Sequence, residues 1–236
     1  MKTSEIIEKN KKAIILIDVQ IPGEANQVKI SIKGTGFIIS LDGKFITNAH
    51  VYRSIQENEM EYAGVSVPGK TDEKGLTHYD RFKIEKIAID EENDVALLKI
   101  IPTQDVTTFS AIESGGLETL ENIKEGQDIV FIGYPLAVEL LNMGFGITMT
   151  TNKCIISSIK RRGVDGSLHF FLVDTHSNGG SSGSPVFSAE TGKVIGISSA
   201  RISSKIQIPN GQIADIPANL GICRPIKYAI ELIEKK

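Results

Sequence analysis

The sequence predicts an all-β protein in which two β-units of about 100 residues each follow one another along the chain. Short runs rich in Ile, Val and Phe recur throughout, separated by Gly, Asn, Asp and Pro. Long amphipathic helices alternating with these runs are missing, which argues against a parallel α/β sheet. A polar stretch over residues 102–126 divides the runs into two groups. We therefore expect one unit over residues 1–105 and a second over residues 106–236.

The expected strands are the runs enriched in β-branched and aromatic residues. They are Ala13–Val19, Gly36–Ser40, Phe82–Ile89 and Val95–Ile100 in the first unit, and Ile129–Tyr134, Cys154–Ile159, Phe170–Val173 and Val194–Ser199 in the second. A short helix is expected near each end of the chain. The first covers Ser4–Lys11 with Thr3 or Ser4 as its N-cap, and the second covers Ile226–Lys235 with Pro225 at its start.

Composition excludes several classes of protein. Lys and Arg total 26 against 29 acidic residues, so neither nucleic acid nor an anionic membrane surface is expected as a partner. Two cysteines, Cys154 and Cys223, cannot build a disulfide framework or a Cys-x-x-Cys metal motif. The apolar run Ala13–Ile17 is too short to cross a bilayer, and no cleavage site for a signal peptide follows it. These features predict a cytoplasmic protein.

Two glycine motifs resemble nucleotide-binding loops but lack the flanking structure such loops need. Residues Gly64–Thr71 fit the phosphate-loop pattern, yet the polar segment Glu57–Tyr62 stands where a buried strand is required. We interpret this motif as a surface loop. Gly34-Thr-Gly36 is part of a dinucleotide fingerprint, but Ile39 occupies the place of the third glycine. A turn entering the strand Phe37–Ser40 explains it better.

The run Gly179-Gly-Ser-Ser-Gly-Ser-Pro185 can be aligned with nucleophile motifs in two ways. As Gly-x-Ser-x-Gly it would make Ser181 the nucleophile of an α/β-hydrolase, whose histidine base follows the serine in the chain. All the histidines of this chain precede Ser181, which excludes that alignment; they are His50, His78, His169 and His176. The other alignment makes Ser182 the nucleophile.

A serine nucleophile needs a histidine base and a carboxylate that orients the base. His50 follows the apolar run Phe45-Ile-Thr and can project from a rigid element. Asp94 stands directly before the strand Val95–Ile100, whereas no such strand directly follows the neighbouring Asp90. The order His50, Asp94, Ser182 is the order found in the chymotrypsin arrangement.

At these residues the chain resembles the trypsin-like serine peptidases, in particular their HtrA/Deg and glutamyl-endopeptidase branches. The resemblance extends over nearly the whole chain and rests on motifs in the expected order. These are Gly34-Thr-Gly-Phe-Ile-Ile, Ile46-Thr-Asn-Ala-His50-Val, Asn93-Asp94-Val-Ala-Leu-Leu-Lys, Gly133-Tyr-Pro135, Asp174-Thr-His-Ser-Asn-Gly-Gly-Ser-Ser182-Gly, Val194-Ile-Gly-Ile-Ser and Leu220-Gly-Ile-Cys-Arg-Pro225.

The resemblance implies two six-stranded antiparallel β-barrels of the chymotrypsin-like fold with the active site between them. It implies a serine endopeptidase that works without metal or cofactor through the triad His50, Asp94 and Ser182. The backbone N–H groups of Gly180 and Ser182 would form the oxyanion hole. Ser198, Ser199 and Ala200 would pair with the backbone of a peptide or protein substrate.

Other family features are altered or missing in this chain. Ser181 replaces the aspartate that pairs with a new amino terminus in digestive relatives, so that activation cannot operate. No PDZ domain follows the last strand within the sequence. His176 is expected at the floor of the primary pocket, where it would favour an acidic side chain or, bonded to backbone, a small apolar one. Residues 136–146 are expected to form a mobile loop or a docking surface.

The alternative function is a catalytically latent or inactive trypsin-like domain that binds peptides or a partner protein. A latent site with a misfolded oxyanion loop would have the same sequence. In that case a separate regulatory protein would be the trigger.

Overall fold

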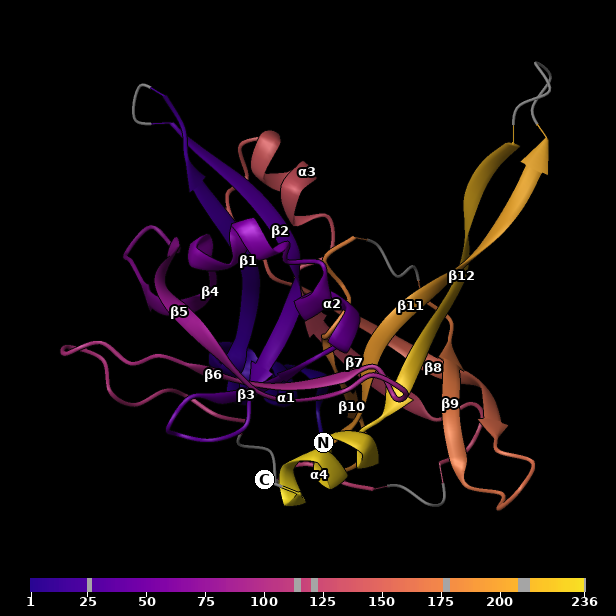
Figure 1. Cartoon of the computed structure of the whole chain (residues 1–236). Helices are drawn as coiled ribbons and strands as arrows, with labels where there is room; N and C mark the ends of the chain where they lie inside the picture. The colour runs from indigo at the N-terminus through magenta and orange to yellow at the C-terminus, as the bar shows by residue number, and fades with distance from the viewer. Residues whose placement is uncertain (25–26, 113–115, 120–122, 176–178, 208–212, 236) are drawn as a thin grey trace.

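The computed structural model describes residues 1–236 except 25–26, 113–115, 120–122, 176–178, 208–212 and 236. It consists of two closed antiparallel barrels of six strands each, which confirms the expected fold class (Figure 1). The strand order is β1-β2-β3-β6-β5-β4 in the first barrel and β10-β11-β12-β9-β8-β7 in the second.

Every expected run overlaps a strand of the structure, although several strands extend further and β4, β10 and β12 were not expected. The first barrel contains β1 Ile14–Pro22, β2 Val28–Ile38, β3 Lys44–Thr47, β4 Ala63–Thr71, β5 Thr77–Asp90 and β6 Val95–Ile100. The second contains β7 Asp128–Gly133, β8 Thr150–Arg161, β9 Leu168–Val173, β10 Pro185–Ser188, β11 Val194–Gln207 and β12 Ile213–Pro225. The α-helices are α1 Thr3–Asn10, α2 Ala49–Arg53, α3 Ala137–Asn142 and α4 Lys227–Glu234, and short 3₁₀ turns cover Lys11–Ala13 and Glu57–Tyr62.

Two local interpretations of the sequence are wrong. Residues Gly64–Thr71 are not a surface loop, because they form most of β4 and pair with both β1 and β5. Gly34-Thr-Gly36 is not a turn but the interior of β2. Pairing with neighbouring strands overrides the local preference of Gly and Pro in both cases. The segment 136–146 contains the short helix α3, and its expected role as a mobile loop or docking surface stays a prediction.

Strand β1 shows how its apolar run positions the two barrels. Ile15 and Ile17 point into the interior of the first barrel, whereas Ile14 and Leu16 belong to a second cluster that also contains residues of the other barrel. Since successive side chains of a strand point to opposite faces, a strand buried on both faces is a continuous apolar run. The run Ala13–Ile17, read in the sequence as an apolar strand, is therefore buried throughout.

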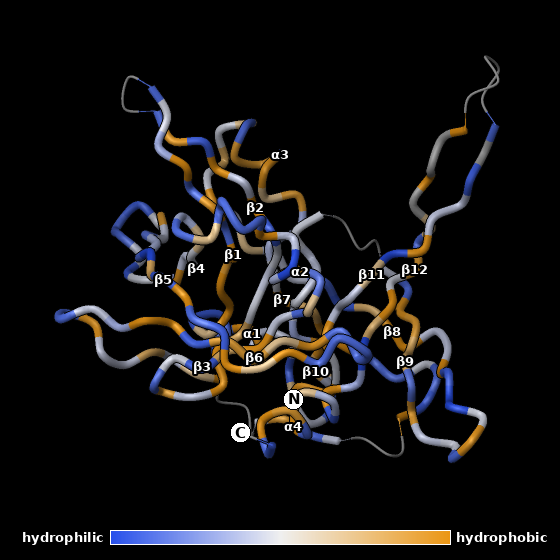
Figure 2. Tube along the Cα trace, viewed as in Figure 1, coloured by the Kyte–Doolittle hydropathy of each residue, from blue (hydrophilic) through white to orange (hydrophobic). Residues whose placement is uncertain are grey.

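The cluster between the barrels joins residues that are far apart in the chain. Tyr134 is fully buried there, and its hydroxyl donates a 3.1 Å hydrogen bond to the carbonyl of Ile14. Ile6 of α1 and Tyr228 of α4 complete the same cluster. Figure 2 shows apolar residues along α4 and β6, which pack together. This shared core fixes the relative position of the barrels, and thus of the catalytic candidates that each one carries.

In the part of the chain that the structure describes, no helix has both the length and the apolar composition needed to span a bilayer.

Candidate active site

His50 is held by the short helix α2, which follows β3 directly. Ala49 and Val51 on either side of it are buried and anchor the helix, while the His50 side chain stays 42% exposed. Asn48 precedes the helix and donates a hydrogen bond from Nδ2 to the carbonyl of Asp94 at 3.0 Å. The imidazole is therefore anchored through its backbone and remains open to a ligand on one side.

Asp94 contacts His50 through both its carboxylate oxygens. His50 Nδ1 lies 3.0 Å from Oδ1 and 2.9 Å from Oδ2, and the backbone N–H of His50 donates to Oδ1 at 2.9 Å. Asp94 adopts a φ of 57°, a left-handed conformation that aspartate tolerates better than most residues. Burial alone would raise the pKa of Asp94, but the hydrogen bonds from His50 and Ser199 outweigh it and lower that pKa. The carboxylate is thus kept ionised beside the imidazole.

Ser199 makes a contact that sequence reasoning missed. Its Oγ donates a 2.6 Å hydrogen bond to Asp94 Oδ2, in addition to the backbone role expected for it. The strand β11 is irregular between Ser198 and Ala200, where its register with β12 shifts. Ser199 is the extra residue at this irregularity. No spacing rule in the sequence predicts such a bulge, and the only available signal was that Ser199 belongs to the stretch expected to pair with substrate.

Ser182 lies in the turn before β10 and is held by both barrels. Thr35 of β2 donates its backbone N–H to the Ser182 carbonyl at 2.8 Å. The hydroxyl Oγ of Ser182 donates a 3.1 Å hydrogen bond to the carbonyl of Ser199. The three residues predicted as a triad are thus brought together: His50 and Asp94 touch directly, and Ser182 is connected to Asp94 through Ser199.

Glycine is required at two positions of the turn around Ser182. Gly180 has a φ of +93°, and a Cβ there would lie 2.2 Å from the carbonyl oxygen of Tyr134. Gly183 has a φ of +87°, and its Cβ would lie 1.9 Å from the carbonyl oxygen of Thr35. Only glycine therefore fits at these two positions, because a side chain would strain the left-handed backbone and clash with the neighbouring carbonyl oxygen.

The same turn leaves two backbone donors available. The carbonyl of Gly179 accepts a 2.7 Å hydrogen bond from Leu136, so the N–H on the other side of that peptide, which belongs to Gly180, points away from Leu136. Within the described residues, neither this N–H nor that of Ser182 donates to a protein acceptor. Two free N–H groups beside a serine can stabilise a developing oxyanion.

The remaining expected site residues have different outcomes. His176 lies outside the described residues. Ser198 is buried, and its backbone bonds to Gly183 and Ser184, whereas Ala200 is exposed. The neighbouring Thr175 lines a cavity of about 20 Å³ with Ser181, Thr150 and Gly221. This volume holds little more than one water molecule. Across the described ranges, no cluster of His, Cys, Asp and Glu has the arrangement of a metal site.

A family model for the trypsin-like peptidase domain matches residues 34–197, a stretch that includes all three triad candidates. The chain belongs to the trypsin-like peptidase family. This result confirms the resemblance on which the expected fold and function rest.

Two curated members of this family illustrate the similarity. The chain is 33% identical to the magnetosome formation protease MamE of Paramagnetospirillum magneticum over 202 residues, which cover 83% of the chain and 23% of MamE. It is 29% identical to the human serine protease HTRA3 over 220 residues, which cover 89% of the chain and 43% of HTRA3. The chain therefore spans less than half the length of these trypsin-like relatives.

A solved structure of the HtrA-type protease AlgWS227A with tripeptide has the same fold. It superposes with a TM-score of 0.61 and covers 99% of this chain and 63% of the other, at 22% sequence identity. At this level of identity the likeness concerns the arrangement of the two trypsin-like barrels.

Proposed function

We propose that the protein is a serine endopeptidase that cleaves peptide bonds through a covalent acyl-enzyme. The observation that carries the proposal is the pair His50–Asp94 with its Nδ1–carboxylate contacts of 2.9 and 3.0 Å, connected to Ser182 through Ser199. A carboxylate on Nδ1 holds the imidazole in the tautomer whose Nε2 accepts a proton.

The roles of the groups follow from this arrangement. The Oγ of Ser182 attacks the scissile carbonyl while Nε2 of His50 takes its proton, and the protonated imidazole then gives the proton to the leaving amine. The backbone N–H groups of Gly180 and Ser182 stabilise the oxyanion. Water then attacks the acyl-enzyme ester, with His50 again as the base, and the carboxylic acid product leaves.

A second function is favoured by one specific contact. Ser182 Oγ donates its hydrogen bond to the Ser199 carbonyl, and within the described residues no hydrogen bond joins it to His50. A domain that stays in this state would bind peptides without cutting them until a partner or ligand changed the contact.

A fluorophosphonate probe distinguishes the two functions, because it reacts only with an activated serine. We expect the wild-type protein and Ser181→Ala to be labelled and Ser182→Ala to remain unlabelled. Ser181→Ala is the matched control, since it removes the hydroxyl of the adjacent residue, which lines the small cavity. A folded wild-type protein that is not labelled would refute catalysis in the isolated chain and leave the latent binding domain.

A further inference from the structure

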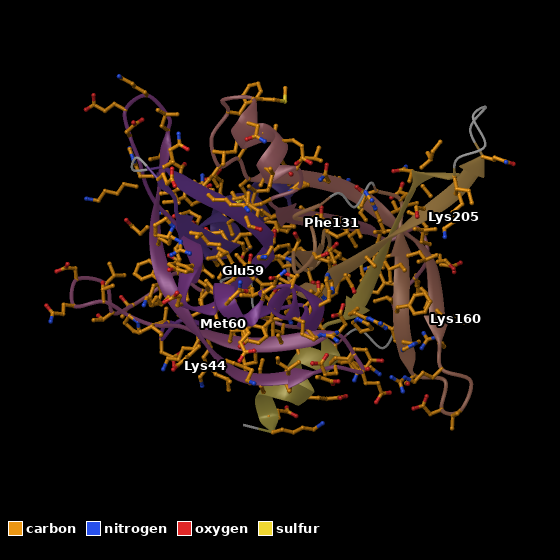
Figure 3. All side chains as sticks on the ribbon, turned by 45° about the horizontal axis from the view of Figure 1, so that its top comes forward. Lys44, Glu59, Met60, Phe131, Lys160 and Lys205 are labelled. Carbon is orange, nitrogen blue, oxygen red and sulfur yellow. The ribbon has the colours of Figure 1, made fainter. Side chains whose placement is uncertain are left out.

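The Gly34-Thr-Gly36 motif lies where the first barrel touches the turn that carries Ser182. Thr35 stands opposite Leu16 in the β1–β2 ladder, and opposed residues of a ladder share one face of the sheet. Leu16 belongs to the cluster between the barrels, so the side chain of Thr35 points toward the second barrel, and it is fully buried there. Figure 3 shows β7, marked by Phe131, on the side of the second barrel that faces the first.

The hydroxyl of Thr35 joins two segments of the second barrel. Its Oγ1 lies 3.1 Å from the backbone nitrogen of Tyr134 and 2.7 Å from the carbonyl oxygen of Gly180. The N–H of Tyr134 can only donate, so the hydroxyl accepts from it and must give its own proton to the carbonyl of Gly180. The orientation of this buried hydroxyl is therefore fixed, and its single proton is used on the turn beside Ser182.

All four carbonyls of the turn 179–182 accept a hydrogen bond from the protein. Thr35 supplies two of these bonds, from its hydroxyl to Gly180 and from its backbone N–H to Ser182 at 2.8 Å. The carbonyl of Gly179 accepts a separate backbone bond at 2.7 Å. The peptides on both sides of Gly180 are thus anchored through their carbonyls, one of them by the Thr35 hydroxyl.

Gly180 depends on these anchors more than another residue would. It has no side chain, and its φ of +93° lies in a region that glycine enters and leaves without steric cost. The direction of its N–H is therefore set by the bonds to the two neighbouring peptides. Because this N–H is one of the proposed oxyanion donors, loss of the Thr35 bond would let it turn away from the oxyanion.

We propose that the hydroxyl of Thr35 is a positioning group for the oxyanion hole, because it fixes from the first barrel the backbone that aims the N–H of Gly180. The proposal rests on the proposed peptidase function and adds a residue to it. Thr35 touches neither the substrate nor the reacting atoms and acts only through Gly180. Gly34 serves the same contact between the barrels, since a Cβ there would lie 2.9 Å from the carbonyl oxygen of Ser182.

Three variants separate the hydroxyl from the shape of the side chain. Thr35→Val removes the hydroxyl and keeps the branched shape, whereas Thr35→Ser keeps the hydroxyl. Thr47→Val is the matched control, because Thr47 is also fully buried in the first barrel and donates one hydrogen bond, at 2.7 Å, to the carbonyl of Thr35 itself. All three variants are compared with the wild-type protein by circular dichroism to establish that they are folded.

The readout is the reaction with the fluorophosphonate probe, resolved into kinact and KI. The phosphoryl oxygen of the probe takes the place of the oxyanion, whereas binding before the reaction does not use the oxyanion donors. We expect kinact to fall about 10-fold in Thr35→Val with KI unchanged, the effect of a buried hydrogen bond left unmade. Thr35→Ser and Thr47→Val should react at the wild-type rate.

Two results would overturn the proposal. Equal kinact values in Thr35→Val and Thr47→Val would show that the hydroxyl serves only the packing of the barrels. A rate in Thr35→Ser as low as in Thr35→Val would show that the methyl group matters and the hydroxyl does not. If Thr35→Val does not fold, Thr35→Cys takes its place, because a thiol is a weaker donor than a hydroxyl, and the same lower kinact is expected.

NMR relaxation of the glycine-¹⁵N-labelled protein tests the positioning without catalysis. The amide peak of Gly180 is identified by its absence from Gly180→Ala. We expect its order parameter to fall from about 0.85 in the wild-type protein to below about 0.6 in Thr35→Val, and to stay high in Thr47→Val. This result would support the positioning role even if the probe did not label the wild-type protein, which would contradict the peptidase function alone. An unchanged order parameter would contradict the positioning role even in an active enzyme.

Discussion

Ser199 of β11, in the second barrel, and Asp94, directly before β6 of the first barrel, are joined by a 2.6 Å hydrogen bond between Oγ and Oδ2. The same Ser199 accepts the hydroxyl of Ser182 at its carbonyl. One residue thus contacts both ends of the candidate triad, and the geometry of the carboxylate depends on the second barrel as well as the first.

Replacing Ser199 with alanine should weaken catalysis through Asp94. Loss of a hydrogen bond to a charged group corresponds to about a 10-fold decrease in kcat/KM. Because that bond helps to lower the pKa of Asp94, this pKa should be higher in the variant than in the wild-type protein. In the wild-type protein, the ionised Asp94 stabilises the fold at pH values above its unfolded pKa, and this stabilisation is lost as the pH falls through the lower folded pKa. Since Ser199→Ala raises the folded pKa of Asp94, acid unfolding should begin at a higher pH in this variant. Denaturation followed from pH 6 to about pH 3 measures this, with Ser198→Ala as the control that leaves Asp94 untouched.

The turn before Ser182 should tolerate alanine at one glycine and not at the next. Gly180→Ala places a Cβ 2.2 Å from the Tyr134 carbonyl at a positive φ, which should displace an oxyanion donor and lower kcat by about 100-fold. The Cβ of Gly179→Ala meets no atom of the described residues within 4 Å, and this variant should keep nearly full activity. Fluorophosphonate labelling rates of the two variants give the comparison, and equal rates would show that the N–H of Gly180 has no role.

Among the described charged side chains, Asp18 should be the most costly to neutralise for the stability of the fold, because it is fully buried. It is fully buried in β1, where it accepts from Arg81 Nε at 2.8 Å and from Ser66 Oγ at 2.7 Å. Asp18→Asn leaves the Arg81 charge without its counter-ion and should lower the free energy of unfolding by about 3 kcal/mol in urea titrations. Asp128→Asn breaks an exposed pair with Lys153 and should cost less than about 1 kcal/mol.

Both cysteines should be inert in the folded protein. Burial, followed by the charges of Asp174 and Asp128, raises the pKa of Cys154 to about 12, and burial raises the pKa of Cys223 as well. Alkylation needs the thiolate, so iodoacetamide at pH 8 should modify neither residue in the native state and both after unfolding in urea. Rapid modification of Cys154 in the native protein, detected by mass spectrometry, would contradict this expectation.

Local signals in the sequence were sufficient to predict an all-β protein of two units and to single out three catalytic candidates, whereas the two barrels followed from the resemblance to the trypsin-like peptidases. His50, Asp94 and Ser182 each stand at the edge of an apolar run, and their order along the chain matches one known arrangement. Strand β4 could not be recognised, since Gly64 and Pro68 have low intrinsic preference for strands and only the neighbours β1 and β5 stabilise it.

Other features depend on contacts that are distant in the sequence. The bulge at Ser199 exists because two strands pair with an offset, which no run of residues encodes. Most of the two-stranded ribbon formed by β11 and β12 (Figure 1) was missed because its exposed strands lack the alternation of apolar and polar residues that a half-buried strand shows. Helix α2 is only five residues long, too short for a helical period to be visible.

The hydrogen bond between Tyr134 and Ile14 has a consequence for the folding of the chain during its synthesis on the ribosome. It closes a loop of 120 residues, and α4 packs into the same core. A growing chain that has already released His50 and Asp94 still lacks Ser182, the shared core and the ribbon. The candidate triad would therefore assemble only after α4 has left the ribosome, because Ser182 and much of the shared core are synthesised later than His50 and Asp94.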